Sequence, residues 1–329
     1  MSLSTQIGFV NESAYGTPMT PTRFFEVNNV PVFEEDRGRT ESGAVRAGDF
    51  DLRDGRSVPF MKGATLPIEM DVPTKGFGWW LQHMLGGTVA TSGPVDGNYT
   101  HTATVGTLLG KSFTAQPGLA FHPSGTLQPF TGHGGKLTSW ELAIDVEGLL
   151  VFTADADFED VDTSTALATF SPASSATVFA WTGTTVTFGA VQKELKNFRV
   201  SRNQNLKTDR HYLRGSSLKK EPTQDGRRSL EWEGDMDFVD LTEYNRFAST
   251  TQAGMNAEIV ATFDGPIAHA GTTLPRLQVT IPVARFDKVS PSADGDFGGM
   301  GQGVSGVGRM PAGGGSAITI SYRTSDVTP

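Results

Sequence analysis

Three glycines match the letters of a dinucleotide-binding loop. Gly301, Gly303 and Gly306 fit the pattern G-x-G-x-x-G. Such a loop needs a strand before it and the start of a helix after it, so that backbone amides and the helix dipole meet the pyrophosphate. Here more glycines follow, and then Pro311. The sequence therefore predicts no cofactor, and the glycine-rich stretch 290–315 is interpreted as a surface loop.

A second candidate for chemistry is the acidic segment ADADFEDVD. Strand alternation would place Asp155, Asp157 and Glu159 on one face. Three carboxylates on one face could hold Ca²⁺, and two could perform acid–base work in a β-rich hydrolase. The glycine and bidentate glutamate of an EF-hand loop do not follow in register. We therefore interpret the segment as the solvated surface of a strand.

Histidine and cysteine chemistry is weakly represented. The chain has no cysteine, which excludes disulfides, thiol nucleophiles and cysteine-ligated metals. Its six histidines show no HxH or HxxxH spacing. His101, His122 and His133 fall in the loop-rich stretch 88–136, where solvated side chains are expected. With no G-x-S-x-G elbow and no P-loop, the sequence predicts no metal and no enzyme.

Charge is distributed unevenly along the chain. The net charge is −9, which argues against a general nucleic-acid binder. Residues 192–228 contain eleven Lys and Arg against four acidic residues, and residues 34–54 contain seven acidic residues against four basic ones. The basic stretch is either a solvated hairpin or an arm that packs on the acidic stretch of a neighbouring chain. The candidate contact residues are Glu34, Glu35, Asp36, Arg37, Arg39, Arg46, Asp49, Asp51, Arg53, Arg202, Lys207, Arg210, Arg214, Lys219 and Lys220.

The elements that would position these residues are mostly strands. Period-2 alternation of apolar and polar residues, as in GATLPIEMDV and LEWEGDMDFV, predicts strands with one buried face. The chain contains 39 glycines and 18 prolines, and turns bound each run. Two short helices are expected, over 76–85 and 241–251, the second with Asp240 as N-cap and Glu243 completing a capping box. The fold class is mainly β.

The order of elements repeats at an offset of about 165 residues. Each half contains a strand, a charged stretch, an alternating strand and a helix, followed by further strands. We expect two tandem related β-sandwich or barrel units, each with one flanking short helix and a long extended hairpin loop. The first unit is 1–162 with an insertion at 88–136, the second is 188–329, and 163–187 forms a linker or β segment.

The N-terminus has no basic and apolar segments of a signal peptide, and no apolar run reaches the roughly 18 residues that span a bilayer. We therefore expect a chain made in a cytoplasm and free of membrane.

Three motifs resemble the major tail tube proteins of long-tailed bacteriophages. IGFVNESAYGTPMTPTRFFEV is similar to that family's opening, G-x-x-x-E-x-x-x-G-T-P. VPTKGFGWWLQHMLGG and DGRRSLEWEGDMDFVDLTEYNRF are similar to its strand-and-helix segments. The resemblance implies a structural virion protein whose β-sandwich, with a helix and long hairpin loops, joins into rings that stack into a hollow tube for DNA.

The resemblance also implies partners. These are other copies of the chain, together with the tail tape measure, the tail terminator and baseplate or tip proteins. A duplicated chain would close a ring as a pseudo-hexameric trimer, whereas one tube domain plus a decoration would need a hexamer. DNA would pass without specific binding, along an acidic lumen to which Asp155, Asp157 and Glu159 could contribute. The alternatives are a capsid decoration or baseplate protein, or a β-sandwich binding module.

Overall fold

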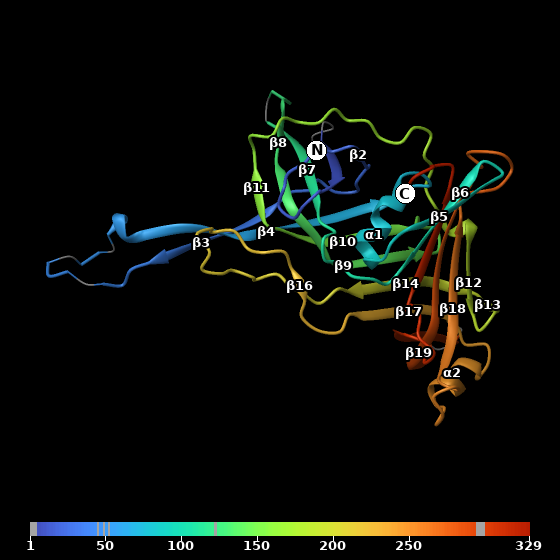
Figure 1. The fold of residues 1–329 in the computed structure, drawn as a ribbon. Helices are drawn as coiled ribbons and strands as arrows, with labels where there is room; N and C mark the ends of the chain where they lie inside the picture. Colours follow the sequence, from blue (N-terminus) through green and yellow to red (C-terminus); the bar gives the residue numbers. More distant parts are fainter. Residues whose placement is uncertain (1–4, 45, 49, 52, 122–123, 294–299) are drawn as a thin grey trace.

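The computed structural model describes residues 5–44, 46–48, 50–51, 53–121, 124–293 and 300–329. It is mainly β, as predicted, with a broad body from which one long hairpin projects (Figure 1).

The helices are α1 (Trp80–Leu85) and α2 (Thr242–Phe247). The strands of the first half are β1 (Gln6–Asn11), β2 (Arg23–Phe24), β3 (Glu34–Glu41), β4 (Ser57–Asp71), β5 (Ala90–Val95), β6 (Asn98–Thr104), β7 (Phe113–Ala120), β8 (Leu127–Pro129), β9 (Thr131–Asp145), β10 (Val151–Phe158) and β11 (Asp160–Asp162). The strands of the second half are β12 (Thr184–Phe188), β13 (Val191–Lys193), β14 (Leu195–Asn203), β15 (Leu206–Lys207), β16 (Thr223–Gln224), β17 (Ser229–Asp237), β18 (Asn256–Asp264), β19 (Arg276–Ala293), β20 (Met300–Arg309) and β21 (Thr319–Thr324).

Eight antiparallel strands run side by side in the order β3–β4–β10–β9–β14–β17–β20–β19. We call this array the main sheet. The pairing of β9 with β14 joins the two halves of the chain within it. Alternation explains why these segments are strands: Leu66, Ile68 and Met70 of β4 are buried while their neighbours reach the surface.

Each half also has a second layer that packs against the main sheet. In the first half, β1, β2, β7 and β11 form it with the first residues of β9. In the second half, β12, β13, β18 and β21 form it with the first residues of β19. The two long strands therefore belong to both layers. Aromatic rings fill the space between layers, with Phe9, Trp80 and Phe113 in the first half and Trp232 and Phe286 in the second.

The first predicted helix is confirmed. A 3₁₀ turn at Phe77–Trp79 leads into α1, and Gly86 ends the helix in the left-handed conformation with φ of 80°. The second helix is shorter than predicted, and its capping box is wrong. Leu241 is the N-cap, Asp240 accepts a hydrogen bond from the Thr242 N–H, and Glu243 turns inward to an ion pair of 2.8 Å with Lys193.

The prediction of a surface loop over 290–315 is wrong for residues 290–293 and 300–309, which are strand, whereas residues 310–315 do form an irregular, mostly exposed connection. β20 lies between β17 and β19 and pairs with both along its length. Val304 is buried, and Gly306 has no room for a side chain because a Cβ there would meet the Arg285 carbonyl. The glycines fit close packing of strands, not a flexible loop.

The stretch 88–136 is also more ordered than predicted. It contains β5, β6, β7 and β8, and β6 pairs with β21 of the second half. His101 and His133 are buried, so the prediction of solvated side chains is wrong for them, and His122 lies outside the described residues.

No helix of the described chain is long and apolar enough to cross a membrane.

Two long connections leave the main sheet, as the sequence predicts. Residues 37–62 form the outer part of the β3–β4 hairpin, which projects far from the body (Figure 1). Residues 204–228 connect β14 to β17, contain the short β15–β16 pair and lie near the base of that hairpin. We call them the arm and the long loop.

Candidate functional site

The main sheet exposes one face, and this face is acidic. Outward-pointing positions on neighbouring strands carry Glu or Asp. Two basic side chains on this face have acidic partners, since Arg199 lies 3.4 Å from Glu141 and Lys196 lies 2.8 Å from Asp237. Lys288 of β19 also lies on this face. The acidic residues are Glu69, Asp71, Glu141, Asp145, Asp155, Glu231, Glu233, Asp235 and Asp237.

The predicted trio of carboxylates is divided by the tertiary structure. Asp155 is exposed on the acidic face and accepts a hydrogen bond from Ser139. Asp157 and Glu159 are buried, because the long loop lies over the end of β10. Lys219 of that loop approaches Asp157 to 2.6 Å, and both side chains are buried. Burial raises the pKa of Asp157, while the Lys219 charge opposes that rise.

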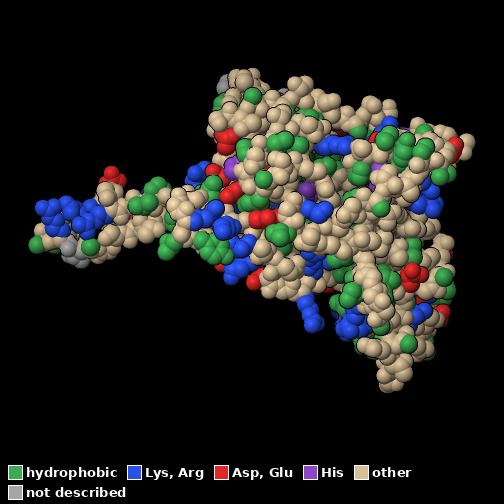
Figure 2. All heavy atoms as spheres, in the orientation of Figure 1, with side chains coloured by type: hydrophobic (Ala, Val, Ile, Leu, Met, Phe, Trp, Pro, Cys, Tyr) green, Lys and Arg blue, Asp and Glu red, His purple; other side chains and the backbone are tan. Residues whose placement is uncertain are grey.

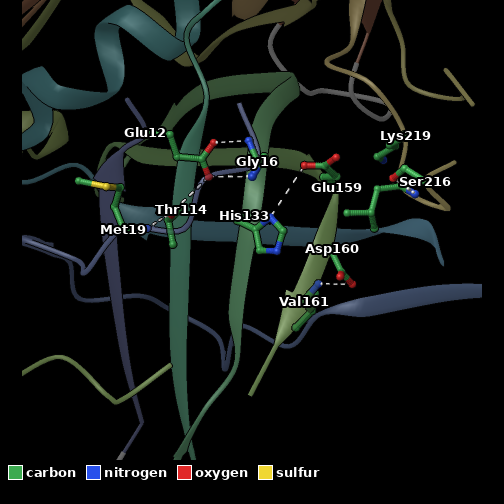
Figure 3. A network of polar contacts seen from close by, with 12 residues as sticks. Glu12, Gly16, Met19, Thr114, His133, Glu159, Asp160, Val161, Ser216 and Lys219 are labelled. Carbon is green, nitrogen blue, oxygen red and sulfur yellow. Dashed lines mark hydrogen bonds and ion pairs between the residues drawn. The ribbon is translucent and has the colours of Figure 1, made fainter. Parts of the chain in front are cut away.

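Glu12 holds the opening motif in place (Figure 3). Its carboxylate accepts hydrogen bonds from the Gly16 N–H at 3.0 Å and the Gly134 N–H at 2.7 Å. It also accepts one from the Thr114 hydroxyl at 3.0 Å. Gly16 has φ of 75°, a conformation that favours glycine. The glutamate and second glycine of G-x-x-x-E-x-x-x-G-T-P therefore fix a turn against the second layer.

A second acidic side chain lies beside this turn. Glu159 Oε2 is 3.9 Å from His133 Nδ1 (Figure 3). Burial raises the pKa of Glu159 to about 7, and the charges of Glu12 and Asp160 add to the rise while Arg214 and Lys219 oppose it. Among the described residues, no three side chains of His, Asp or Glu converge on a possible metal position.

The long loop is fastened to the first half by buried ion pairs and hydrogen bonds. Lys136 of β9 lies 2.7 Å from Glu221, and Arg228 donates to the Gly106 carbonyl at 2.8 Å. Arg202 is buried in β14, and burial lowers its pKa to about 10. Arg202 and Lys219 are therefore both buried within the chain.

The remaining basic residues predicted for contacts lie in or beside the same loop. Arg214 donates to the Leu218 carbonyl and Arg210 to that of Glu221, which shapes the loop itself. Lys207 and Lys220 are exposed. These two therefore have charged groups that a neighbouring chain could reach.

The arm is solvent-exposed almost throughout. Basic side chains gather at its far end (Figure 2), and Arg37 lies 2.5 Å from Glu35 while Lys62 lies 3.4 Å from Asp36 near its base. Asp49 lies outside the described residues. The other predicted contact residues of this segment are exposed: Glu34, Glu35, Asp36, Arg37, Arg39, Arg46, Asp51 and Arg53.

The glycine pattern at 301–306 is part of strand β20. Gly301, Gly303 and Gly306 are paired with β17 on one side and β19 on the other. Their backbone groups therefore serve the sheet and do not form a cradle for phosphate.

Comparison with known proteins identifies the family of the chain. A family model described as phage tail tube protein matches residues 2–323, nearly the whole chain. No curated protein matches the chain. Members of this family are structural, non-enzymatic subunits that self-assemble in the tail of the virion. The chain belongs to the phage tail tube protein family.

Proposed function

We propose that three copies of this chain close a ring of six similar units, and that such rings stack into the hollow tube that conducts DNA. Each chain supplies two units, 1–162 and 188–329, joined by 163–187. The acidic face of the main sheet lines the bore. The arms and the exposed charges of the long loops join one ring to the next.

The observation that carries this proposal is the correspondence between strand pairings in the two halves. Every pairing of the first half's core strands has a counterpart in the second half, with the same orientation and chain order. The counterparts are β1 with β12, β2 with β13, β3 with β14, β4 with β17, α1 with α2, β7 with β18, β9 with β19, β10 with β20, and β11 with β21.

Irregularities in the sheet recur at corresponding positions. The β9–β10 ladder shifts by one residue at Thr138, and the β19–β20 ladder shifts by one residue at Asp287. The arm and the long loop connect corresponding strands and differ in length by one residue. A chance likeness between two all-β halves would not reproduce a bulge, so these features favour duplication and a ring of three chains.

The acidic face suits the lining of a DNA channel. DNA binds to proteins largely because basic groups release counterions from its phosphates. A face with Glu231, Glu233 and Asp235 repels phosphate instead, so DNA would slide past without specific binding. Of the predicted lumen residues, Asp155 is exposed on this face, while Asp157 and Glu159 are buried beside the long loop and would not line the bore.

The ends of such a tube would contact different proteins. At one end we place the tail terminator and at the other the baseplate or tip proteins, with the tape measure protein inside the bore. The exposed residues of the arm, such as Arg39, Arg46 and Arg53, are the contacts we assign to stacking.

Electron microscopy of the purified chain tests this proposal. We expect rings or tubes in concentrated protein, with three copies per ring by native mass spectrometry and sixfold-like features in end-on images. Six copies per ring would contradict the duplicated unit, and a monodisperse monomer under all assembly conditions would contradict self-assembly through these surfaces.

A further inference from the structure

We propose that neighbouring chains in the ring join by pairing the free edge of β19 in one chain with the free edge of β3 in the next. This inference rests on the duplicated unit proposed above. It follows from the internal junction of β9 with β14, which shows how one unit meets another. It assigns the partner, a second copy of this chain, and the register of the contact.

The internal junction is a regular antiparallel ladder. Residues 139–145 of β9 pair with residues 197–203 of β14, with Glu141 opposite Ser201 and Ser139 opposite Asn203. The ladder starts just after the bulge at Thr138, whose carbonyl accepts a hydrogen bond from the Gln204 N–H at 2.8 Å. The edge strand of the first unit's part of the main sheet, β9, thus meets the edge strand of the second unit's part, β14.

The two counterparts of these strands lie at the ends of the main sheet. Within the described residues, β3 pairs with β4 alone, and β19 pairs beyond Phe286 with β20 alone. The two strands lie on opposite sides of the molecule (Figure 1). Val30 and Val32, just before β3, are each 48% exposed, although apolar side chains favour burial. Both edges therefore offer unpaired backbone groups to another chain.

The internal ladder predicts the register of the contact between chains. The β3–β4 ladder of the first unit can be aligned with the β14–β17 ladder of the second. In this alignment Glu34 corresponds to Ser201, and Asp36 corresponds to Asn203. The bulge at Thr138 in β9 can likewise be aligned with the bulge at Asp287 in β19. Ser290 then corresponds to Glu141, and Lys288 corresponds to Ser139. Glu34 of one chain would therefore face Ser290 of the next, and Asp36 would face Lys288.

Charge supports this register. Asp36 and Lys288 are both exposed and have opposite charges. Directly opposed charges across an antiparallel pair are favourable, whereas like charges are not. Each joint uses two different edges, so copies connect head to tail, the type of contact from which a ring of three closes when each copy is rotated by a third of a turn.

A helix end also supports the contact. At the internal junction, Gln204 donates to the Met84 carbonyl and Arg228 to the Leu85 carbonyl, at the end of α1. Their counterparts in the next chain would be Arg37 and Lys62, two cations that would reach the end of α2. Cations are favoured there by the helix dipole. The arm base would also cover apolar side chains of α2 that are now exposed, Leu241, Tyr244 and Phe247.

Engineered disulfides test the register, because the chain has no cysteine of its own. We expect Glu34→Cys with Ser290→Cys to form intermolecular disulfides in assembled protein under mild oxidation. On a denaturing gel without reductant, the largest cross-linked band should be the trimer, because a closed ring of three chains has no free edge left to link. Each single variant should stay monomeric on the same gel.

The internal junction supplies the matched control. Glu141→Cys with Ser201→Cys should form a disulfide within one chain, seen as a mobility shift of the monomer. If this control pair links and wild-type tubes form, yet Glu34→Cys with Ser290→Cys gives no oligomer, the proposed junction is overturned while the tube function stands. If the wild-type chain forms neither rings nor tubes, the tube function itself fails.

A charge exchange tests the same contact without oxidation. Lys288→Asp should abolish ring formation while circular dichroism shows an unchanged fold. Adding Asp36→Lys to the same chain should restore rings, because the opposite charges face each other again. Rings formed by Lys288→Asp alone, or no rescue by the double exchange, would contradict the pairing of these two positions.

Discussion

Lys219 Nζ lies 2.6 Å from Asp157 Oδ1, across 62 positions of the sequence. Lys219 belongs to the long loop of the second half, and Asp157 to β10 of the first. Both side chains are buried. This ion pair therefore fastens the second half of the chain onto the first, next to the pairing of β9 with β14.

Breaking this pair should destabilise the chain strongly. Lys219→Met leaves a buried carboxylate without its partner, which typically costs about 3 to 5 kcal/mol of unfolding free energy. The exposed Lys207 is the matched control, and Lys207→Met should change stability by less than about 0.5 kcal/mol. Urea unfolding at pH 7 measures both. Equal, small effects of the two variants would contradict a stabilising role for the pair.

The raised pKa of Glu159 predicts a pH-dependent stability. The folded-state pKa is about 7 and the ordinary value is 4.5. The protonated form is favoured in the folded state, so this contribution is fully present below pH 4.5 and is lost as pH rises through about 7. Glu159→Gln should therefore be more stable than wild type at pH 8, by on the order of 1 to 2 kcal/mol after solvent screening, with little difference at pH 4.5.

Thermal unfolding of both proteins across this pH range checks the prediction. The exposed Glu258 on β18 is the control, and Glu258→Gln should leave the pH profile of the melting temperature unchanged. A constant difference between Glu159→Gln and wild type at all pH values would show that the carboxyl does not titrate in this window.

The close packing at Gly306 predicts a sharp cost for one methyl group. Gly306→Ala would press its Cβ against the Arg285 carbonyl, so β20 must shift from β19. We expect a loss of at least about 1 to 3 kcal/mol of unfolding free energy. In contrast, Gly55 in the arm has open space around it, and Gly55→Ala should be nearly neutral. Chemical unfolding compares the two, and equal stabilities would contradict the pairing of β20 within the main sheet.

Shortening the arm should separate folding from assembly. Replacing residues 42–56 by Asn-Gly would connect Glu41 to Ser57 through a two-residue turn, and these two residues already pair at the end of the hairpin. The removed residues lie outside the buried core, so cooperative unfolding should be retained. We expect rings without stacked tubes in electron micrographs. Full-length tubes, or a variant that does not unfold cooperatively, would contradict the role assigned to the arm.

Reversing charge on the acidic face should make the tube retain DNA. Glu231→Lys with Glu233→Lys places cations on the proposed lumen, and DNA affinity should rise and then fall steeply with added salt. The control is Glu26→Lys with Glu258→Lys, which changes net charge equally at exposed positions off this face. Filter binding over a salt series compares the two. Equal DNA binding by both variants would remove the acidic face from the lumen.

Local sequence patterns determined much of this protein. Alternation in GATLPIEMDV and LEWEGDMDFV is enough to predict β4 and β17, because successive side chains of a strand point to opposite faces. Gly86 marks the end of α1 for an equally local reason, its left-handed backbone. The opening motif predicted the family, although its physical role, a turn held by Glu12, appears only in three dimensions.

Only the tertiary structure decided which charges are buried and which edges stay free. Asp155 and Asp157 are equivalent in the sequence pattern, yet one is exposed and the other is covered by a loop from the opposite half of the chain. The glycines of β20 predict a flexible loop from sequence alone, but in the structure they are paired with β17 on one side and β19 on the other. Burial and strand pairing depend on contacts between residues far apart in the chain, and no local pattern of residue types contains that information.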